Sequence, residues 1–526
     1  MRTERPSKQR GVGACVSDQD QTESKKSMKT MRICDRVHGE ITIPPFVAAI
    51  ATHKIFHRLD SVRQLGGCAF VYPSATHTRR EHSLGVCHLA GDMGLHLKER
   101  YPNLVDDDDI LCLQIAGLAH DMGHGPFSHT FEDYMHEHVK DWSHEDSACV
   151  LLEKVFMELV SEYDPFKKGT EQQHFRTIQL MISGIQDDDV ITFEEFNRYP
   201  DQRFLFEIVH NQTNGIDVDK WDYLCRDALC AFGATRQLSL ARLIGATRLV
   251  EKNKFFTIAF DENVAFEMAE MYALRARLHR QVYQHHGVIL VESLIVELMN
   301  AIDRVSLPQD RFFAIAQDKD RFTSFVDASI LCHPLLQHEA VIPYYECLLN
   351  WTNTTRTRST IVLHTLPLCS NCGRETELTA SFCTHCGAST KDRTGLVSGS
   401  GVEVAPACYA TGESITARLC KHLKRDDVRV SVRDIKCGKG IVVEDPHGRK
   451  WMDYDPLKCV TFVGKDDRPS RVEATSHHAP RYRHVRTARC YVMKMNIGKE
   501  ELSEIDIAFV HMCEGIGFMD SGIFED

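Results

Sequence analysis

The amino-acid sequence predicts a mostly α fold, with a helical core, a small insertion and a C-terminal α+β lobe. Three observations support this prediction. Apolar side chains follow helical spacing between about residues 46 and 350, with breaks at glycine and proline. Two pairs of closely spaced cysteines then occupy residues 369–386. Beyond a stretch rich in serine and glycine, a helical segment precedes runs of alternating apolar and polar residues, which are typical of strands.

Length and composition exclude several classes of protein. At 526 residues, the chain is long enough for two or more hydrophobic cores. The formal net charge of −12 argues against a protein that coats nucleic acid, although it leaves room for a local basic groove. No apolar run reaches the roughly 18 residues of a membrane span, and the N-terminus lacks an apolar secretory core. We therefore expect no membrane partner, a location in the nucleus or cytoplasm, and reduced cysteines.

Taken in order, the chain begins with about 30 polar residues without periodicity, which predict a disordered tail. The segment from Asp35 to Pro45 predicts a short strand pair that leads into the first helix. The helical period is lost over residues 351–368. We divide the chain into a disordered tail at 1–30, a helical domain at 31–365, a cysteine-rich insertion at 366–390, a linker at 391–410 and an α+β lobe at 411–526.

Within the C-terminal lobe, the pattern predicts one helix followed by several strands. The helix is expected near Ile415–Leu423. Strands are expected at the alternating runs Val428–Val432, Lys458–Val463, Cys490–Met495 and Ile505–Val510.

The cysteine-rich insertion has the spacing of a zinc ribbon. Cys369 and Cys372 form one C-x-x-C pair, and Cys383 and Cys386 form a second, each followed by glycine. Each pair turns tightly and offers two thiolates to a tetrahedral zinc ion. Because a four-cysteine site has no open position, we expect this structural zinc to stabilise a small module and to perform no chemistry.

One stretch of the helical domain carries a concentration of chemically active side chains. An apolar helical run from Ile110 to Leu118 ends in the dipeptide His120-Asp121, and glycines then break the helix. His124 and His129 follow on the turn. An imidazole beside a carboxylate can give neighbouring bonds to one divalent cation. A helix end with polar residues that face water is the alternative.

Partners for such a cation occur both upstream and downstream. His82 lies in the first turn of an amphipathic helix and is a plausible third ligand. Asp219 offers a fourth, and it shares one helical face with Tyr223 and Asp227 because the three recur every four residues. Lys220, beside Asp219, would meet a phosphate that the metal also holds.

Four motifs make the resemblance to a known family close. They are His-x-Arg-x-Glu-His-Ser-Leu-Gly at 77–85, His-Asp-x-Gly-His-Gly-Pro-Phe-Ser-His at 120–129, Asn-Gly-Ile-Asp-Val-Asp-Lys-Trp-Asp-Tyr at 214–223 and Leu-His-Arg-x-x-Tyr-Gln-His at 278–285. In this order they resemble the eukaryotic SAM-and-HD-domain deoxynucleoside triphosphate triphosphohydrolases, over roughly residues 31–350. A SAM domain is not expected, since only about 30 residues precede the resemblance. The zinc ribbon has no counterpart in the family pattern.

The resemblance implies a role for each matching residue and a helical HD-domain core. The catalytic metal would be bound by His82, His120, Asp121 and Asp219. The reacting phosphate would be lined by His124, His129, His144 and Glu145, with His129 as the acid and Glu132 as the carboxylate that orients it. The triphosphate would be held by Arg79, Lys220 and Arg275. The sugar would be surrounded by Gln64, Leu65, Tyr223, Asp227 and Tyr283, with Tyr283 packed where a ribonucleotide has its 2′-hydroxyl.

The residue types agree with this chemistry. Arginine offers a fixed fork of donors to phosphate oxygens and lysine offers a mobile point charge. A divalent metal lowers the pKa of bound water from about 15.7 towards 7, and a histidine can protonate the leaving oxygen near neutral pH. Histidine and aspartate ligands suit iron, manganese, zinc or magnesium, so the metal stays open.

The resemblance fails at the positions where the animal enzymes bind activating guanine nucleotides. Thr52, His57 and Asp60 stand where the family has an acid, a glutamine and an arginine. His286 replaces a lysine, and Asp261 and Asn263 fall where the family has basic residues. We therefore expect guanine-nucleotide activation to be lost or altered. A homo-oligomer is still expected, because helical domains of this family generally pair.

The leading hypothesis is hydrolysis of deoxynucleoside triphosphates (dNTPs), dGTP among them, to deoxynucleoside and inorganic triphosphate, which would regulate dNTP pools. A first alternative is an HD phosphohydrolase that acts on another nucleotide; the three cations named above favour a triphosphate. A second alternative is a nucleic-acid-binding protein with a secondary HD site, which the ribbon and the basic segments 351–358 and 421–429 suggest. The acidic total and the lack of interleaved aromatics near the ribbon weigh against it.

Overall fold

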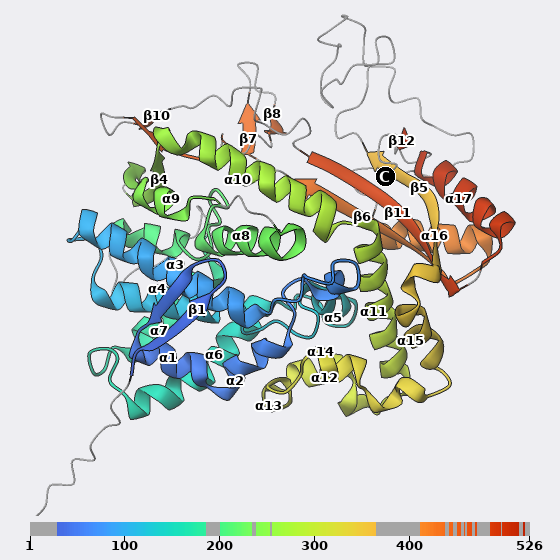
Figure 1. The fold of residues 1–526 in the computed structure, drawn as a ribbon, viewed down its shortest axis with the longest axis horizontal. Coiled ribbons are helices and arrows are strands. Elements are labelled where there is room, and N and C mark those ends of the chain that lie inside the picture. The colour runs from blue at the N-terminus through green and yellow to red at the C-terminus, as the bar shows by residue number, and fades with distance from the viewer. Residues whose placement is uncertain are drawn as a thin grey trace, which may run out of the picture.

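The fold is described from a computed structural model and is mostly α, as predicted (Figure 1). The described residues are 29–185, 200–233, 238–252, 255–363, 411–436, 441–444, 450–453, 457, 460–464, 469–470, 484–495, 497–514 and 519–520. Nearly all of the predicted tail, the linker and the predicted ribbon with Cys369, Cys372, Cys383 and Cys386 lie outside these residues.

A strand pair and a series of helices make up the helical domain. The antiparallel pair β1 (Met31–Asp35) and β2 (Gly39–Ile43) leads into α1 (Pro45–Thr52), as predicted. The helices that follow are α2 (Lys54–His57), α3 (Arg79–Arg100), α4 (Asp107–Ala119), α5 (His129–His138), α6 (His144–Glu162), α7 (Glu171–Ser183), α8 (Val218–Phe232), α9 (Leu240–Gly245), α10 (Ala265–Leu278), α11 (His286–Val305), α12 (Phe312–Gln317), α13 (Lys319–Phe322), α14 (Asp327–Leu331) and α15 (Ile342–Leu349).

Helix α4 is the buried centre of this domain. Asp106 caps its N-terminus and forms a capping box with Asp109, which satisfies two backbone donors. The side chains of Leu113, Ile115 and Ala116 are completely buried. Because α3 and α7 pack against α4, apolar residues surround it on most sides. Its C-terminal end, at His120, is therefore held in a fixed position.

Helices α3 and α8 approach each other closely at Gly85. A Cβ atom built on Gly85 would lie 1.9 Å from Asp222 Oδ1 and 2.6 Å from an Arg226 side-chain nitrogen. Only glycine fits at this crossing. The approach brings His82, one turn before Gly85, against the first turns of α8.

The C-terminal lobe is built on an antiparallel sheet with the strand order β12-β5-β11-β6. Its helices α16 and α17 share a small core that includes Leu419 and Val430. The elements are β5 (Thr354–Leu363), α16 (Gly412–Leu423), β6 (Val428–Lys436), β11 (His484–Met495), α17 (Lys499–Glu514) and β12 (Met519–Asp520). A separate hairpin joins β7 (Ile441–Glu444) to β8 (Lys450–Asp453).

The strand predicted at Ile505–Val510 is wrong, because these residues lie within helix α17. Ile505, Phe509 and Cys513 are buried at four-residue spacing, so the apolar residues follow a helical face. The alternation of apolar and polar residues in this run is too short to distinguish a strand from a helix.

The helical domain also contains two strands that the sequence pattern did not predict. Strands β3 (Thr247–Lys252) and β4 (Phe255–Asp261) form an antiparallel hairpin. The run predicted as a strand at Lys458–Val463 contributes only β9 (Phe462–Val463) among its described residues. β9 pairs parallel to β4 and antiparallel to β10 (Pro469–Ser470). One sheet, with the order β10-β9-β4-β3, therefore combines strands from the predicted helical domain and from the predicted C-terminal lobe. Within the described residues, no helix combines the length and apolar character that crossing a bilayer requires.

Candidate metal and phosphate site

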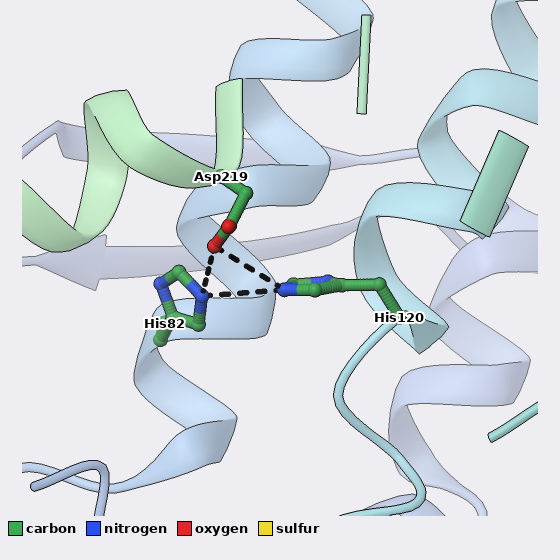
Figure 2. Close-up of side chains that lie close together, drawn as sticks. All are labelled: His82, His120 and Asp219. Carbon is green, nitrogen blue, oxygen red and sulfur yellow. Dashed lines mark hydrogen bonds and ion pairs between the residues drawn. The ribbon is translucent and has the colours of Figure 1, made fainter. Parts of the chain in front are cut away.

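Three of the four predicted ligands come together from three helix ends, and Asp121 lies beside them. His82 comes from α3, His120 from the C-terminal end of α4 and Asp219 from the first turn of α8 (Figure 2). The two histidine Nε2 atoms lie 3.3 Å apart, and Asp219 Oδ1 lies 3.0 Å from His82 Nε2 and 3.6 Å from His120 Nε2. Asp121 Oδ2 lies 3.5 Å from His82 Nε2, and its Oδ1 lies 3.5 Å from His120 Nε2. The ligand atoms of His82, His120 and Asp219 all lie within 4.8 Å of one another, and Asp121 joins a second such group with His124 and His144.

The outer hydrogen bonds of both imidazoles fit a metal site. His82 Nδ1 lies 2.7 Å from Asp222 Oδ2, and His120 Nδ1 lies 2.8 Å from the carbonyl oxygen of Gly117. Each Nδ1 therefore donates its proton outward, and each Nε2 faces the cluster. A cation bound there would take the two Nε2 lone pairs and the neighbouring carboxylates as ligands.

The carboxylates of the cluster also favour positive charge at its centre. Burial by itself lowers the pKa of His82. Hydrogen bonds to Asp219 and Asp222, together with the nearby carboxylates, outweigh burial and raise the pKa to about 10. The pKa of His120 is raised by Asp121 and Asp219 in the same way, against the effect of burial. A divalent cation would supply the charge that these carboxylates attract.

The loop that follows the ligands is held in an uncommon conformation. Phe127 and Ser128 both have positive φ angles, 58° and 56°, although neither is glycine. Asp327 Oδ1 accepts a hydrogen bond from the Phe127 backbone at 2.7 Å, and Ser128 Oγ accepts one from Arg79 Nε at 2.9 Å. These bonds offset the strain and fix the start of α5, where His129 lies.

A second group of histidines lies next to the ligands. Glu132 accepts from His129 Nδ1 at 2.9 Å and from His144 Nδ1 at 3.0 Å, so the predicted longer carboxylate does reach His129. Burial raises the pKa of Glu132, but these two bonds outweigh it and hold the pKa well below its ordinary value. Glu145 lies 3.5 Å from His144.

His124 is kept neutral in the centre of this group. Its ring stacks on His144 with centroids 3.9 Å apart, and its Nε2 lies 3.3 Å from Asp121 Oδ1. Burial, with the charges of Arg79 and His144, holds its pKa well below the ordinary value. A neutral imidazole here can donate its one N–H to a phosphate oxygen.

A cavity of about 500 Å³ collects most of the predicted site residues. Fifteen of them line it: Gln64, Leu65, Arg79, His120, Asp121, His124, His129, His144, Glu145, Asp219, Lys220, Tyr223, Asp227, Arg275 and Tyr283. The other two do not line the cavity but contact residues that do: His82 contacts His120, and Glu132 contacts His129. Three of the lining residues are the predicted cations, and each is anchored: Arg79 to Asp121 at 2.7 Å, Lys220 to Asp217 at 3.1 Å, and Arg275 beside Tyr223.

Sequence reasoning missed several lining residues. Arg433 reaches the cavity from β6, Glu292 from α11 and Asp133 from α5. The other missed polar residues include Thr130, His210, Asp217, His279 and Gln284. Asp217 could have been found, since an aspartate two positions before Asp219 is a helix N-cap. A lone arginine on a strand carries no such signal.

Comparison with known proteins identifies the domain. Residues 79–224 match the model of the HD domain, and this range contains all four ligands. The chain carries an HD domain. The HD domain begins at the N-terminal end of α3 and ends within α8, so its bounds enclose the three helices that position the ligands.

Relatives of the chain extend the similarity beyond the HD domain. The deoxynucleoside triphosphate triphosphohydrolase SAMHD1 of Gallus gallus is 35% identical over 340 residues, which cover 61% of this chain and 54% of the relative. The Homo sapiens protein of the same name is 32% identical over 313 residues, or 57% of this chain and 50% of the relative. The SAMHD1 homolog of Dictyostelium discoideum is 29% identical over 308 residues, or 58% and 54%. The chain thus spans about half the length of these relatives.

Proposed function

We propose that the chain is a metal-dependent triphosphohydrolase that cleaves dNTPs into deoxynucleoside and inorganic triphosphate, and so regulates dNTP pools. One observation carries the proposal: the four-ligand cluster, three anchored cations and a histidine–carboxylate pair border a single cavity. Relatives named as dNTP triphosphohydrolases support the substrate class.

The metal would be held by His82, His120, Asp121 and Asp219. A divalent cation bound there would polarise the α-phosphoryl group and lower the pKa of the attacking water. Arg79, at the edge of the cluster, and Lys220, next to Asp219, lie where they can hold phosphate oxygens. Three cations in one cavity suit a triphosphate better than a monophosphate, which disfavours the first alternative.

His129 would protonate the leaving group. Water attacks the α-phosphorus, the bond from phosphorus to O5′ breaks, and O5′ takes a proton to become the 5′-hydroxyl of the deoxynucleoside. The His129 side chain is 67% exposed, with its Nδ1 held by Glu132, so its Nε2 is free to face a substrate. Because Glu132 stays ionised, it stabilises the protonated imidazole before the transfer.

The product distribution tests the proposal. Purified protein should be incubated with each dNTP and Mn²⁺ or Mg²⁺, and the products separated by chromatography. We expect deoxynucleoside and triphosphate. Deoxynucleoside monophosphate and pyrophosphate would mean attack on a different bond of the substrate and would exclude this activity.

Two histidines on α5 provide a matched pair of variants. His129→Ala should reduce kcat by roughly 100-fold to 10,000-fold, the range for loss of a general acid. His136→Ala removes an exposed histidine of the same helix that bonds to the carbonyl oxygen of Trp142 and does not line the cavity. It should leave kcat unchanged, and equal losses in both variants would contradict the role of His129.

A further inference from the structure

Three charged side chains, from elements far apart in sequence, line one part of the cavity. Arg433 from β6 donates to Asp133 Oδ2 of α5 at 2.8 Å. Glu292 from α11 lies close enough to Arg433 and Asp133 that both affect its pKa, and all three border the cavity. They take no part in the proposed metal site or in holding the triphosphate.

These three side chains lie near residues of the proposed sugar pocket. Helix α8 carries Asp219 at the metal and Asp227 two turns later, roughly 12 Å further along the helix axis. Cys68 lines the cavity beside the charges of both Glu292 and Asp227, which raise the pKa of its buried thiol further. Glu292 therefore lies near Asp227, a residue of the proposed sugar pocket.

The strand that carries Arg433 is fixed at this point. Gln284, which lines the cavity, donates from Nε2 to the carbonyl oxygen of Asp434 at 2.9 Å. Its own carbonyl oxygen accepts a hydrogen bond from Arg489 of β11 at 3.1 Å. β6 and β11 are paired neighbours in the sheet (Figure 1). Arg433 is therefore presented to the cavity by a tethered strand.

Polar atoms of the cavity wall are left for a ligand. The amide oxygens of Gln64 and Gln284 are buried, line the cavity and have no hydrogen-bond partner among the residues that the structure describes. Burial raises the pKa of Glu292 to about 8, so its carboxyl group is mostly protonated at neutral pH and both donates and accepts. Arg433 adds a fork of donors.

We propose that Arg433, Glu292 and Asp133 form a base-reading subsite that selects a guanine deoxynucleotide. A guanine base offers the acceptors O6 and N7 to a guanidinium, and this is the commonest specific arginine–base contact. Its N1–H and N2–H groups match carboxyl and amide oxygens. Adenine presents a donor where guanine has O6, and would oppose the arginine. The inference rests on the proposed function, whose substrate it specifies.

The test compares kcat/KM for the four dNTPs. The wild type should favour dGTP over dATP by roughly 10-fold or more, because a good bidentate contact discriminates by about that factor. Arg433→Gln should lower kcat/KM for dGTP by a similar factor and leave dATP nearly unchanged. Glu292→Gln, which keeps a donor and an acceptor, should retain the preference, whereas Glu292→Leu should lose it.

Arg429 provides the matched control. It lies on the same strand β6 and pairs with Glu297 of the same helix α11 at 2.6 Å, but it does not line the cavity. Arg429→Gln should leave all four values of kcat/KM unchanged. Equal kcat/KM for the four dNTPs in the wild type, or equal effects of the two arginine variants on dGTP, would overturn the inference.

Failure of the proposed function is distinguishable from failure of the subsite. If no dNTP is hydrolysed, calorimetric titration of dGTP and dATP into the wild type and Arg433→Gln in EDTA measures binding alone. Tighter binding of dGTP by the wild type only would support the subsite although the proposed reaction had failed. Equal or undetectable binding of the two nucleotides would overturn the subsite as well.

Discussion

At the scale of single residues, the buried pair His77–Asp227 stabilises the fold, and Asp227 also belongs to the proposed sugar pocket. His77 Nε2 lies 2.8 Å from Asp227 Oδ1, and both side chains are almost completely buried. The other oxygen of Asp227 accepts from the Tyr283 hydroxyl at 2.5 Å. Burial lowers the pKa of His77, but the bond to Asp227 and its charge outweigh burial and raise the pKa to about 9.

This pair predicts a loss of stability at alkaline pH. Because the folded pKa lies above the unfolded value of about 6.5, the stabilisation is complete below pH 6.5 and is lost as the pH rises through 9. A shift of this size corresponds to roughly 3 kcal/mol at most. We expect the unfolding free energy of the wild type to fall between pH 6.5 and 9 by more than that of His77→Gln, as measured by urea denaturation. Parallel pH profiles of the two proteins would contradict this.

The candidate ligands could be predicted from sequence because their chemistry and spacing are local. His120 and Asp121 adjoin at a helix end, and Asp219 follows a helix cap, so each signal lies within one turn. Arg433 and Glu292 have no local signal, since only the pairing of β6 with β11 and the docking of this sheet bring them to the cavity. A short sequence motif cannot predict contacts that depend on tertiary packing.

At the scale of elements, the crossing of α3 and α8 decides whether the ligands meet. His82 lies on one helix and Asp219 on the other, and Asp222 of α8 holds His82 Nδ1 in place. Gly85 permits the approach, and Arg226 of α8 neutralises Asp222 with two bonds of 2.8 Å. The strand misassigned at Ile505–Val510 concerns a helix far from this crossing, so the error left the site prediction intact.

Replacing Gly85 tests this crossing. In Gly85→Ala the new methyl group would overlap the side chains of Asp222 and Arg226, so this buried pair, which holds His82 Nδ1, must shift. We expect a loss of stability of about 1–3 kcal/mol, as for overpacked cores, and weaker Mn²⁺ binding by calorimetry. Gly94→Ala on the same helix is the control, because its nearest contact, Ile110 Cγ1, lies at 3.0 Å, compared with 1.9 Å at Gly85. Unchanged Mn²⁺ affinity in Gly85→Ala would argue against control of the ligands by this crossing.

At the scale of the whole molecule, strands from distant parts of the chain tie the C-terminal segment to the helical domain. β9 pairs with β4 of the helical domain, and β5, which follows α15, pairs with β11 and β12. Arg433 and the anchored Gln284 belong to the same connection. Because residues of both segments line the cavity, a structural change in either segment can alter the proposed activity.

Regulation by guanine nucleotides should be absent or altered, because the positions expected to bind the activator already form ion pairs. His57 lies 3.2 Å from Asp60, and Arg80 lies 3.5 Å from the same carboxylate. Arg80 therefore pairs with an acid at this position, and Asp60 would repel a phosphate. Asp261, at the second expected site, pairs with Arg248 at 3.5 Å.

The measurement is the rate of dCTP loss with and without GTP, together with the molar mass in solution under both conditions. Allosteric coupling ordinarily changes affinity by roughly 5-fold to 150-fold, so we expect the effect of GTP to stay below 5-fold. The molar mass should likewise not depend on GTP. The side chains at these positions are not expected to bind a GTP phosphate, so GTP would not link two copies of the chain. A larger rate increase, or assembly that requires GTP, would show that other residues have taken over the binding of the activator.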